Sequence, residues 1–409
     1  MQDQAAEGDS AAGPRSFARR VFYIPGYDPF HPRRYRELYR TEASAQAAIS
    51  GYEIALKPKS TKGPYGWLVR SQIGGAQTSA EVEVLVWSDL VKGSMARGIF
   101  GTYLQMLRTA SIYIGSGALF GLMRLRKGPM IAALYPIVFL VVQLGLGVLA
   151  GWGLFLALAP VHRALGVLVG AGALYAILDL FRRWDNKVFA YYLMHDYAFG
   201  AQFQGANPPE LEARMAQFRA AIGEALRGGH DEVLVVGHSS GAHLAVSVLA
   251  DLIRAGAVPP GADLGFLSLG QVVPMVSFLP KAARLRADLA YLCTRPELTW
   301  IDVTAPGDGC AFALCDPVCV SGVAPVTGKI WPLVISAAFT QSLSPARWKE
   351  LRWKFFRLHF QYLCAFDRPK DYDYFQITAG PLTLAQRFSG RAASKSRNET
   401  PVNRYRSVT

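Results

Sequence analysis

Several features that would assign a protein class are scarce or absent in this sequence. Its 409 residues include five cysteines, an odd and small number that excludes the disulfide framework of a small secreted domain. Cys310, Cys315 and Cys319 lie close together, but their spacing matches no zinc signature, so we expect buried free thiols. The N-terminus lacks the apolar core of a signal peptide. Because no nucleic-acid-binding motif is present, the excess of 43 basic over 30 acidic residues favours an anionic lipid surface as partner.

Charge is missing altogether from one long stretch. Residues 128–162 contain no Asp, Glu, Lys or Arg. A helix rises about 1.5 Å per residue, so this stretch is longer than the roughly 30 Å hydrocarbon core of a bilayer. A second apolar run, residues 164–181, carries one acid, Asp179, and follows a turn at Pro160 to Arg163. The sequence therefore predicts a hairpin of two transmembrane helices, with a helical hairpin buried in the protein core as the alternative.

Glycine spacing and flanking charge agree with a membrane hairpin. Each arm has a pair of glycines four residues apart, which lets two helix backbones approach closely in lipid: Gly147 and Gly151, and Gly166 and Gly170. Basic residues flank both outer ends of the hairpin: Arg124, Arg126, Lys127, Arg182, Arg183 and Lys187. The turn carries only Arg163. The positive-inside rule then predicts that both ends, and any enzymatic part, lie in the cytoplasm.

The stretch with the clearest chemical content is residues 231–246. It has the layout of a nucleophile elbow, which consists of a buried strand, a sharp turn and an apolar helix. The turn is Gly237-His238-Ser239-Ser240-Gly241. Glycine is needed on both sides of the serine because a β-carbon would block so sharp a turn. The arrangement exposes the Ser239 hydroxyl at the end of the sheet, with the Ser240 N–H at the positive end of the helix. Side chains of neighbouring elbow residues point apart, so we assign His238 to packing.

The chain around the elbow alternates strands with helices. Val21 to Ile24 is a short buried strand that ends in the turn Pro25-Gly26-Tyr27, and a helix follows from about Arg34 to Ile49. Beyond the elbow, further elements are expected at 264–269 (strand), 281–292 (helix) and 298–304 (strand). This alternation is typical of an α/β fold, with a mostly parallel sheet flanked by helices.

A serine nucleophile needs a general base, and the base needs a carboxylate to orient it. Only two histidines follow the serine, His243 on the elbow helix and His359, which we expect at the end of a last strand. No residue lies at a sequence spacing from His195 that would indicate a catalytic or metal-binding partner, so His195 is interpreted as structural. Asp308 lies in a loop just beyond a predicted strand, and we favour it over Asp302, which lies inside that strand and would be costly to bury unpaired. Two weaker candidate acids remain, Asp316 and Asp367.

Together the elbow, the turn at Gly26 and Tyr27, the Asp308 loop and His359 resemble the α/β-hydrolase superfamily, particularly its lipase and esterase branch, in which Gly-His-Ser-x-Gly is frequent. The resemblance implies the chain order serine, acid, histidine, which leaves His359 as the base. It also implies an oxyanion hole formed by the N–H groups of Ser240 and of Tyr27 or Gly26. Residues 90–230 are not covered, so the hairpin is interpreted as an insertion.

The expected layout is therefore as follows: a disordered lead-in (1–16), the first part of a hydrolase domain (17–95), interfacial or cap helices (96–128), a transmembrane hairpin (129–183), the second part of the hydrolase domain (184–386) and a basic disordered tail (387–409). The predicted function is membrane-anchored hydrolysis of carboxylic, lipid-type esters by Ser239, His359 and Asp308, without metal or cofactor. Two alternatives stay open: a membrane acyltransferase that uses the same acyl-enzyme, and a non-catalytic membrane adaptor. The substrate's acyl chain and head group, and the oligomeric state, are not predicted.

Overall fold

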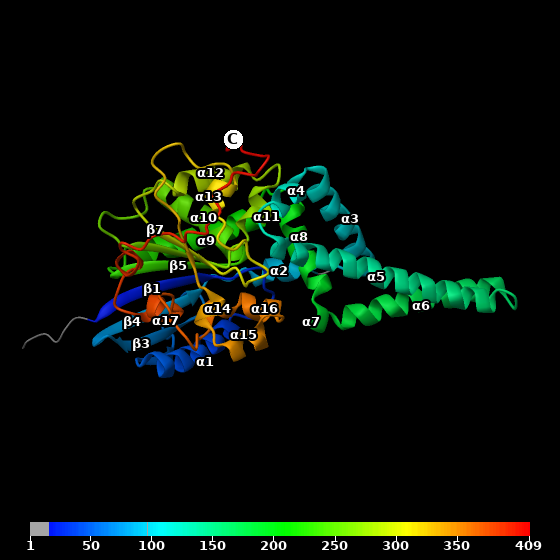
Figure 1. Cartoon of the computed structure of the whole chain (residues 1–409), viewed down its shortest axis with the longest axis horizontal. Helices are drawn as coiled ribbons and strands as arrows, with labels where there is room; N and C mark the ends of the chain where they lie inside the picture. Colours follow the sequence, from blue (N-terminus) through cyan, green and yellow to red (C-terminus); the bar gives the residue numbers. More distant parts are fainter. Residues whose placement is uncertain (1–15, 96) are drawn as a thin grey trace, which may run out of the picture.

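A computed structural model describes residues 16–95 and 97–409, so nearly all of the expected lead-in lies outside the described residues. An eight-stranded sheet with the order β2-β3-β4-β1-β5-β6-β7-β8 forms its centre (Figure 1). The strands are β1 (Phe17–Ile24), β2 (Glu53–Pro58), β3 (Gly66–Ile73), β4 (Ala76–Val84), β5 (Glu232–His238), β6 (Leu264–Leu269), β7 (Thr299–Thr304) and β8 (Leu333–Ser336). From β4 to β8 in this order, neighbouring strands run parallel, whereas β2, β3 and β4 pair antiparallel. The predicted α/β fold with a mostly parallel sheet is confirmed.

Helices cover both faces of this sheet, which explains why β5 is apolar along most of its length. Val233 and Val235 point to one face, and Leu234 and Val236 to the other. The first face is covered by α2 (Ser88–Met95), α9 (Pro209–Leu226), α10 (Ser240–Arg254), α11 (Val273–Ser277), α12 (Ala283–Leu292) and α13 (Pro317–Val320). The second face is covered by α1 (Arg33–Ser50), α14 (Phe339–Ser342), α15 (Pro345–Leu351), α16 (Phe355–His359), η1 (Gln361–Leu363), α17 (Tyr374–Ala379) and α18 (Leu384–Arg387).

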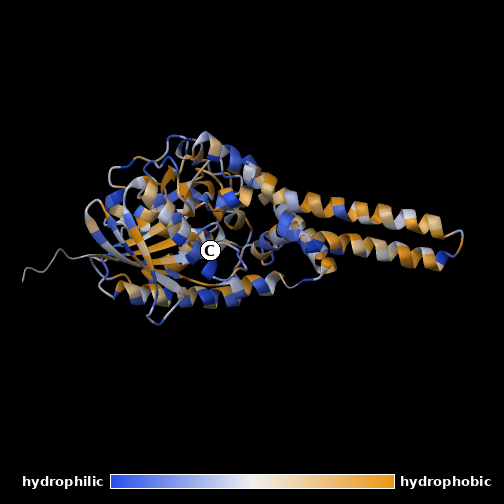
Figure 2. Ribbon diagram, turned by 90° about the horizontal axis from the view of Figure 1, so that it is seen from below, coloured by the Kyte–Doolittle hydropathy of each residue, from blue (hydrophilic) through white to orange (hydrophobic). Residues whose placement is uncertain are grey.

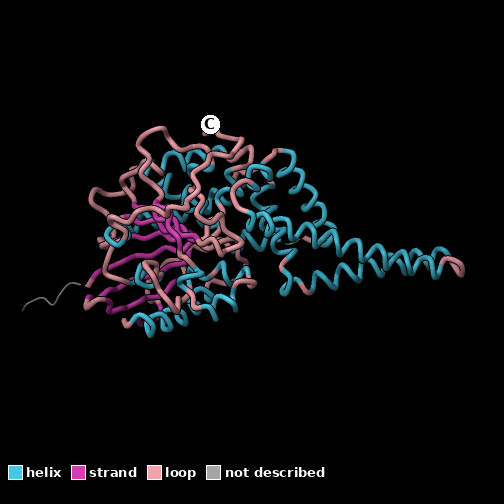
Figure 3. The backbone as a smooth tube through the Cα atoms, in the orientation of Figure 1, coloured by secondary structure: helices cyan, strands magenta, loops and turns pink. Residues whose placement is uncertain are grey.

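A third group of helices lies beyond the carboxyl ends of the parallel strands (Figures 1 and 3). We call it the cap: α3 (Ile99–Gly115), α4 (Ala118–Met123), the first half of α5 (Lys127–Leu158), α7 (Asp185–Val188) and α8 (Ala190–Ala201). Its small apolar core joins α3, α5 and α8 through Met106, Leu140 and Met194. The hydroxyl of Tyr113 donates a hydrogen bond of 2.8 Å to the carbonyl of Met275, which ties the cap to the α/β domain.

The second half of α5 and all of α6 (Arg163–Arg183) project from the domain as a helical hairpin. Figure 2 shows that both arms are apolar over most of their length. Both helices are long and apolar enough to cross a membrane. The glycines face each other as the spacing predicts, because a β-carbon added at Gly151 would lie 2.6 Å from the carbonyl oxygen of Gly170. The predicted pair of apolar helices is thus present, with the turn at residues 159–162.

The C-terminal segment differs from the prediction of a disordered tail. Residues 388–409 have almost no regular secondary structure, but they pack against the α/β domain and the cap. The Asn403 side chain is buried and donates to the carbonyls of Ser277 (3.0 Å) and Ser321 (3.2 Å). Tyr405 donates to the carbonyl of Ser116 (2.9 Å). The Arg- and Ser-rich composition suggested solvation, yet these backbone carbonyls provide buried partners that composition does not reveal.

Candidate active site

Ser239 occupies a strained turn between β5 and α10. Its backbone has φ 56° and ψ −123°, a conformation that few residues other than glycine adopt. The Ser239 N–H donates a hydrogen bond of 2.9 Å to the carbonyl of Leu269 at the end of β6, which holds the turn against the neighbouring strand. Such strain at a serine that follows a buried parallel strand is typical of a nucleophile held above the sheet.

The flanking glycines are required by close backbone contacts. A β-carbon at Gly241 would lie 2.1 Å from the carbonyl oxygen of Ile24 on β1. One at Gly237 would lie 2.8 Å from the Cα of Ala242. Any side chain at either position would therefore push α10 away from the sheet and move the serine, as the sequence pattern predicts.

The turn after β1 lies directly beside Ser239. A β-carbon at Gly26 would lie 2.9 Å from the Cβ of Ser239 and 3.4 Å from its Oγ. The indole N–H of Trp87 donates to the carbonyl of Pro25 (2.9 Å) and fixes this turn. Within the described residues, the N–H groups of Tyr27 and Ser240 make no hydrogen bond in the protein. Two N–H donors without an acceptor in the described protein thus belong to the two turns that meet at Ser239, and an oxyanion hole requires donors of this kind.

His359 and Asp308 form a buried pair next to the elbow. The distance from His359 Nδ1 to Asp308 Oδ2 is 2.7 Å, and the Tyr362 hydroxyl donates to the same oxygen at 3.0 Å. The Cys310 N–H donates to the other carboxylate oxygen at 2.9 Å. Burial alone would raise the pKa of Asp308, but His359 and these hydrogen bonds outweigh it and lower the pKa. The carboxylate is therefore ionised and suited to orient an imidazole.

The local structure around His359 differs from the prediction. His359 is the last residue of the short helix α16 and does not end a strand; the last strand, β8, ends at Ser336. Aromatic residues before the histidine suggested a strand because they have high β propensity. In the structure, these residues instead form helical hydrogen bonds between positions four apart, such as that from the Leu358 N–H to the carbonyl of Lys354 (2.8 Å). The chain still delivers the histidine to the carboxyl edge of the sheet.

The two imidazole nitrogens of His359 have different environments. Its Nε2 is buried and, among the described residues, has no hydrogen-bond partner. Ser239 and His359 line the same cavity, but no hydrogen bond joins their side chains. His359 lies beside the elbow, because its ring centroid is 4.8 Å from that of His238.

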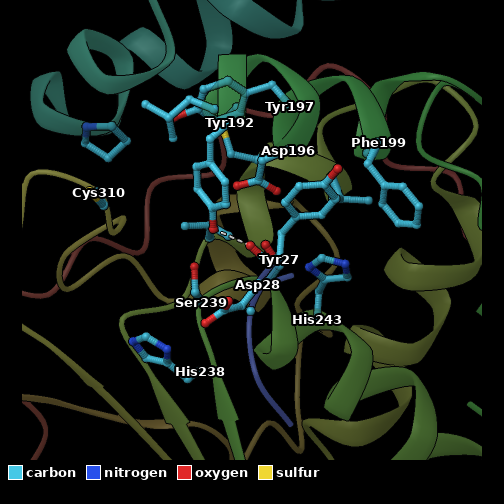
Figure 4. A pocket seen from close by; sticks show the side chains of 18 of the residues that line it. Tyr27, Asp28, Tyr192, Asp196, Tyr197, Phe199, His238, Ser239, His243 and Cys310 are labelled. Carbon is cyan, nitrogen blue, oxygen red and sulfur yellow. Dashed lines mark hydrogen bonds between the residues drawn. The ribbon is translucent and has the colours of Figure 1, made fainter. Parts of the chain in front are cut away.

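His238 has a structural environment. Its side chain points away from the Ser239 hydroxyl (Figure 4), and its Nε2 lies 3.0 Å from the carbonyl oxygen of His359. Burial and the adjacent His359 lower the pKa of His238 to about 3, so the ring is neutral. His195 is also buried and lies 2.8 Å from Gln105 through its Nδ1, within the cap.

The other candidate acids lie in different surroundings. Asp302 is fully buried in β7 and accepts a hydrogen bond of 2.6 Å from Ser268. Burial raises the pKa of Asp302 to about 8, so it is protonated at neutral pH and meets no histidine. Asp316 caps α13 and pairs with Lys329 at 2.8 Å. Asp367 is exposed and accepts from the Ser344 N–H.

The cavity at Ser239 has wall residues that the sequence did not single out, namely Tyr192, Asp196 and Phe199 on α8 (Figure 4). The other walls come from the turn after β1, from α10 and from the loop after β7, and they include His243 and Cys310. The hydroxyl of Tyr192 donates to the carbonyl of Tyr27, which joins the cap to the Gly26 turn. Only the aromatic-rich composition of residues 184–204 hinted at this wall.

Two groups of side chains have spacing compatible with a metal ion: Asp308, Cys310 and His359, and Asp316, Cys319 and Glu399. In the first group the Asp308 and His359 atoms already hydrogen-bond to each other, and burial raises the pKa of the Cys310 thiol. In the second, Lys329 pairs with Asp316. Neither group is an open set of ionised ligands.

Comparisons of the chain with protein-family models, with curated proteins and with solved structures give no match. Function is therefore inferred from the residues and geometry of this site.

Proposed function

We propose that this protein is a membrane-anchored serine hydrolase that cleaves carboxylic esters. One observation supports this above all others: a strained serine at the carboxyl end of a parallel strand lines one cavity with a histidine that is hydrogen-bonded to a buried carboxylate. Ser239, Asp308 and His359 follow β5, β7 and β8 in that order. This order supports membership of the α/β-hydrolase superfamily as part of the same proposal.

In the proposed mechanism, Ser239 Oγ attacks the ester carbonyl carbon while His359 Nε2 accepts the hydroxyl proton. Asp308 stabilises the resulting imidazolium through Nδ1–H. The N–H groups of Ser240 and of Tyr27 or Gly26 bind the oxyanion, and each contributes on the order of 3 kcal/mol to transition-state stabilisation. His359 then protonates the leaving alcohol. Water attacks the acyl-enzyme by the reverse proton path and releases the acid.

The hairpin supports the membrane part of the proposal. Phe139 on α5 contacts Phe181 on α6 at a ring-centroid distance of 5.7 Å, and Leu158 ends α5 at the far turn. The rise between Phe139 and Leu158 is roughly 30 Å, which matches a bilayer core. Arg182 and Arg183 at the base would then lie at the lipid head groups, and the positive-inside rule favours the cytoplasmic side for the α/β domain.

The outer face of α3 extends this lipid-facing surface. Phe100, Leu104, Leu107 and Ile114 recur at helical spacing, and all are exposed. The helix α3 lies in the cap near the base of the hairpin (Figure 1), where an interfacial helix would rest on the bilayer. A site held at this level supports lipid-type esters as substrates.

A direct test measures hydrolysis of p-nitrophenyl butyrate and of a long-chain acyl ester in detergent micelles. We expect the wild-type protein to release both acids and Ser239→Ala to release neither above background. Addition of a primary alcohol as acceptor distinguishes hydrolysis from acyl transfer, because a transferase would form the new ester as its main product. Equal rates in the wild type and Ser239→Ala would refute the proposal.

A further inference from the structure

Asp196 on α8 is a carboxylate for which the proposed mechanism has no use. Its side chain points into the Ser239 cavity from the cap, opposite the elbow (Figure 4). Among the described residues, no hydrogen bond or ion pair involves this carboxylate. The other acid of the cavity wall, Asp28, accepts hydrogen bonds from the Tyr35 hydroxyl (2.7 Å) and the Phe30 N–H (2.9 Å). Asp196 therefore has unused acceptor capacity at a position that a ligand can reach.

An unpaired carboxylate in such surroundings is costly to the fold. Burial raises the pKa of Asp196 to about 7, against a smaller opposing effect of His359. A leucine or an asparagine at this position would avoid that cost. A carboxylate with unused acceptor capacity on the wall of a cavity is a feature that can orient a ligand.

The surroundings of Asp196 favour a cation over other ligands. Aromatic side chains line the cavity on either side of it, namely Tyr27, Tyr192, Tyr197 and Phe199. An ammonium group can pair with a carboxylate and contact ring faces at the same time. A phosphate or carboxylate on the substrate would instead be repelled by Asp196.

A second cavity indicates which half of an ester each region accepts. It lies among α3, α4, α5 and α8 and is almost wholly apolar, with walls that include Ile114, Leu122, Ile137 and Met194. It shares Tyr113, Tyr197 and Met275 with the Ser239 cavity, so the two adjoin. Its apolar lining suits an acyl chain better than a charged group, which leaves Asp196 to the alcohol half.

We propose that Asp196 binds a positively charged ammonium group on the alcohol part of the ester substrate. This inference rests on the proposed hydrolase function and adds the substrate class to it. Asp196 is here a specificity-determining residue that contacts substrate, and no covalent step is assigned to it.

The test uses two esters of the same shape that differ in charge, butyrylcholine and 3,3-dimethylbutyl butyrate, with the full-length protein in detergent. We expect the wild-type kcat/KM to be at least ten-fold higher for the cationic ester, and the ratio to fall toward one in Asp196→Asn. Asp371→Asn, which removes an exposed carboxylate that pairs with Arg391 and does not line the cavity, should keep the wild-type ratio. Thermal unfolding of Asp196→Asn checks that the variant is folded.

Failure of this inference can be separated from failure of the hydrolase proposal. If both esters are hydrolysed with equal kcat/KM, or if Asp196→Asn lowers both equally through an effect on His359, the ammonium site is refuted while the hydrolase stands. Calorimetric binding of butyrylcholine to Ser239→Ala gives a readout that needs no turnover. If Ser239→Ala binds the cationic ester more tightly than the neutral ester, and if the added substitution Asp196→Asn removes this preference, the site is supported even if the wild type hydrolyses neither ester. No binding preference would overturn it.

Discussion

At the scale of single residues, Asp302 and Asp308 are both buried and lie close together in the sequence, Asp302 on β7 and Asp308 in the loop that follows it. Their side chains nevertheless contact different partners. Asp308 contacts His359 Nδ1, whereas Asp302 contacts Ser268. Asp308→Asn should lower kcat for ester hydrolysis by on the order of 10⁴, because it removes the negative charge and the tautomer control. Asp302→Asn is the matched control and should retain wild-type kcat. The proposed assignment of the acid fails if Asp302→Asn is the inactive variant.

The burial of Asp302 also leads to a prediction about the pH dependence of stability. Burial raises its pKa to about 8 in the folded chain, whereas the pKa of an aspartate in an unfolded chain is about 4. Between these two pH values the folded chain binds one proton more than the unfolded chain. The contribution of protonated Asp302 to the free energy of unfolding is therefore complete below about pH 4 and is lost as pH rises toward 8. The free energy of unfolding of the wild type relative to Asp302→Asn should therefore fall by about 1.4 kcal/mol per pH unit.

Chemical denaturation of the two proteins at pH 5, 6, 7 and 8 measures this difference. A difference that stays constant with pH would mean that Asp302 is ionised when folded, and would contradict the assigned environment.

The residues of the site were predictable to different degrees. Ser239 stands in a local pattern whose steric logic depends only on neighbouring glycines, and the sequence is enough to place it. His359 could be selected only through the chain order implied by a family resemblance. Asp196 could not be found, because its significance depends on α8 folding over the elbow, and no local pattern encodes that contact.

At the scale of elements, the hairpin depends on glycines at the contact between its arms. A side chain at Gly151 would collide with the backbone of α6, whereas a β-carbon at Gly153 would meet no atom within 4 Å. Gly151→Leu should therefore separate the arms and lower the thermal stability of the detergent-solubilised protein by several degrees. Gly153→Leu adds the same side chain to the exposed side of the hairpin and should leave stability near that of the wild type. Equal effects of the two substitutions would contradict the observed packing.

Secondary structure followed local periodicity where the pattern was strong and departed from it where tertiary contacts decide. The strand at 264–269 was predicted to the residue, because its apolar run is bounded by turn residues. The chain before His359 was wrongly assigned to a strand, since its aromatic residues serve the core and the cavity from a short helix. The tail was wrongly judged disordered because Asn403 and Tyr405 find partners in parts of the chain far away in sequence.

At the scale of the whole molecule, the proposal assigns catalysis to the α/β domain and membrane anchoring to the hairpin. Residues 145–176 contribute nothing to either cavity wall. Replacement of these residues by a short Gly-Ser linker should convert the protein from one that resists alkaline carbonate extraction of membranes into one that is extracted. Reactivity of Ser239 should be kept, because the cap and the elbow remain. A variant that still resists carbonate would show that the hairpin is not the anchor.

The central claim is that Ser239 is a nucleophile activated by His359. Its most direct test is mass-spectrometric mapping of the adduct formed by a fluorophosphonate probe with the full-length protein, together with the rate of labelling. The proposal predicts a single adduct on the peptide that contains Ser239, no adduct in Ser239→Ala, and a labelling rate reduced at least 10³-fold in His359→Ala, on the order of the loss seen when a triad member is removed. An unlabelled wild-type protein, or an adduct whose rate is unchanged in His359→Ala, would contradict it.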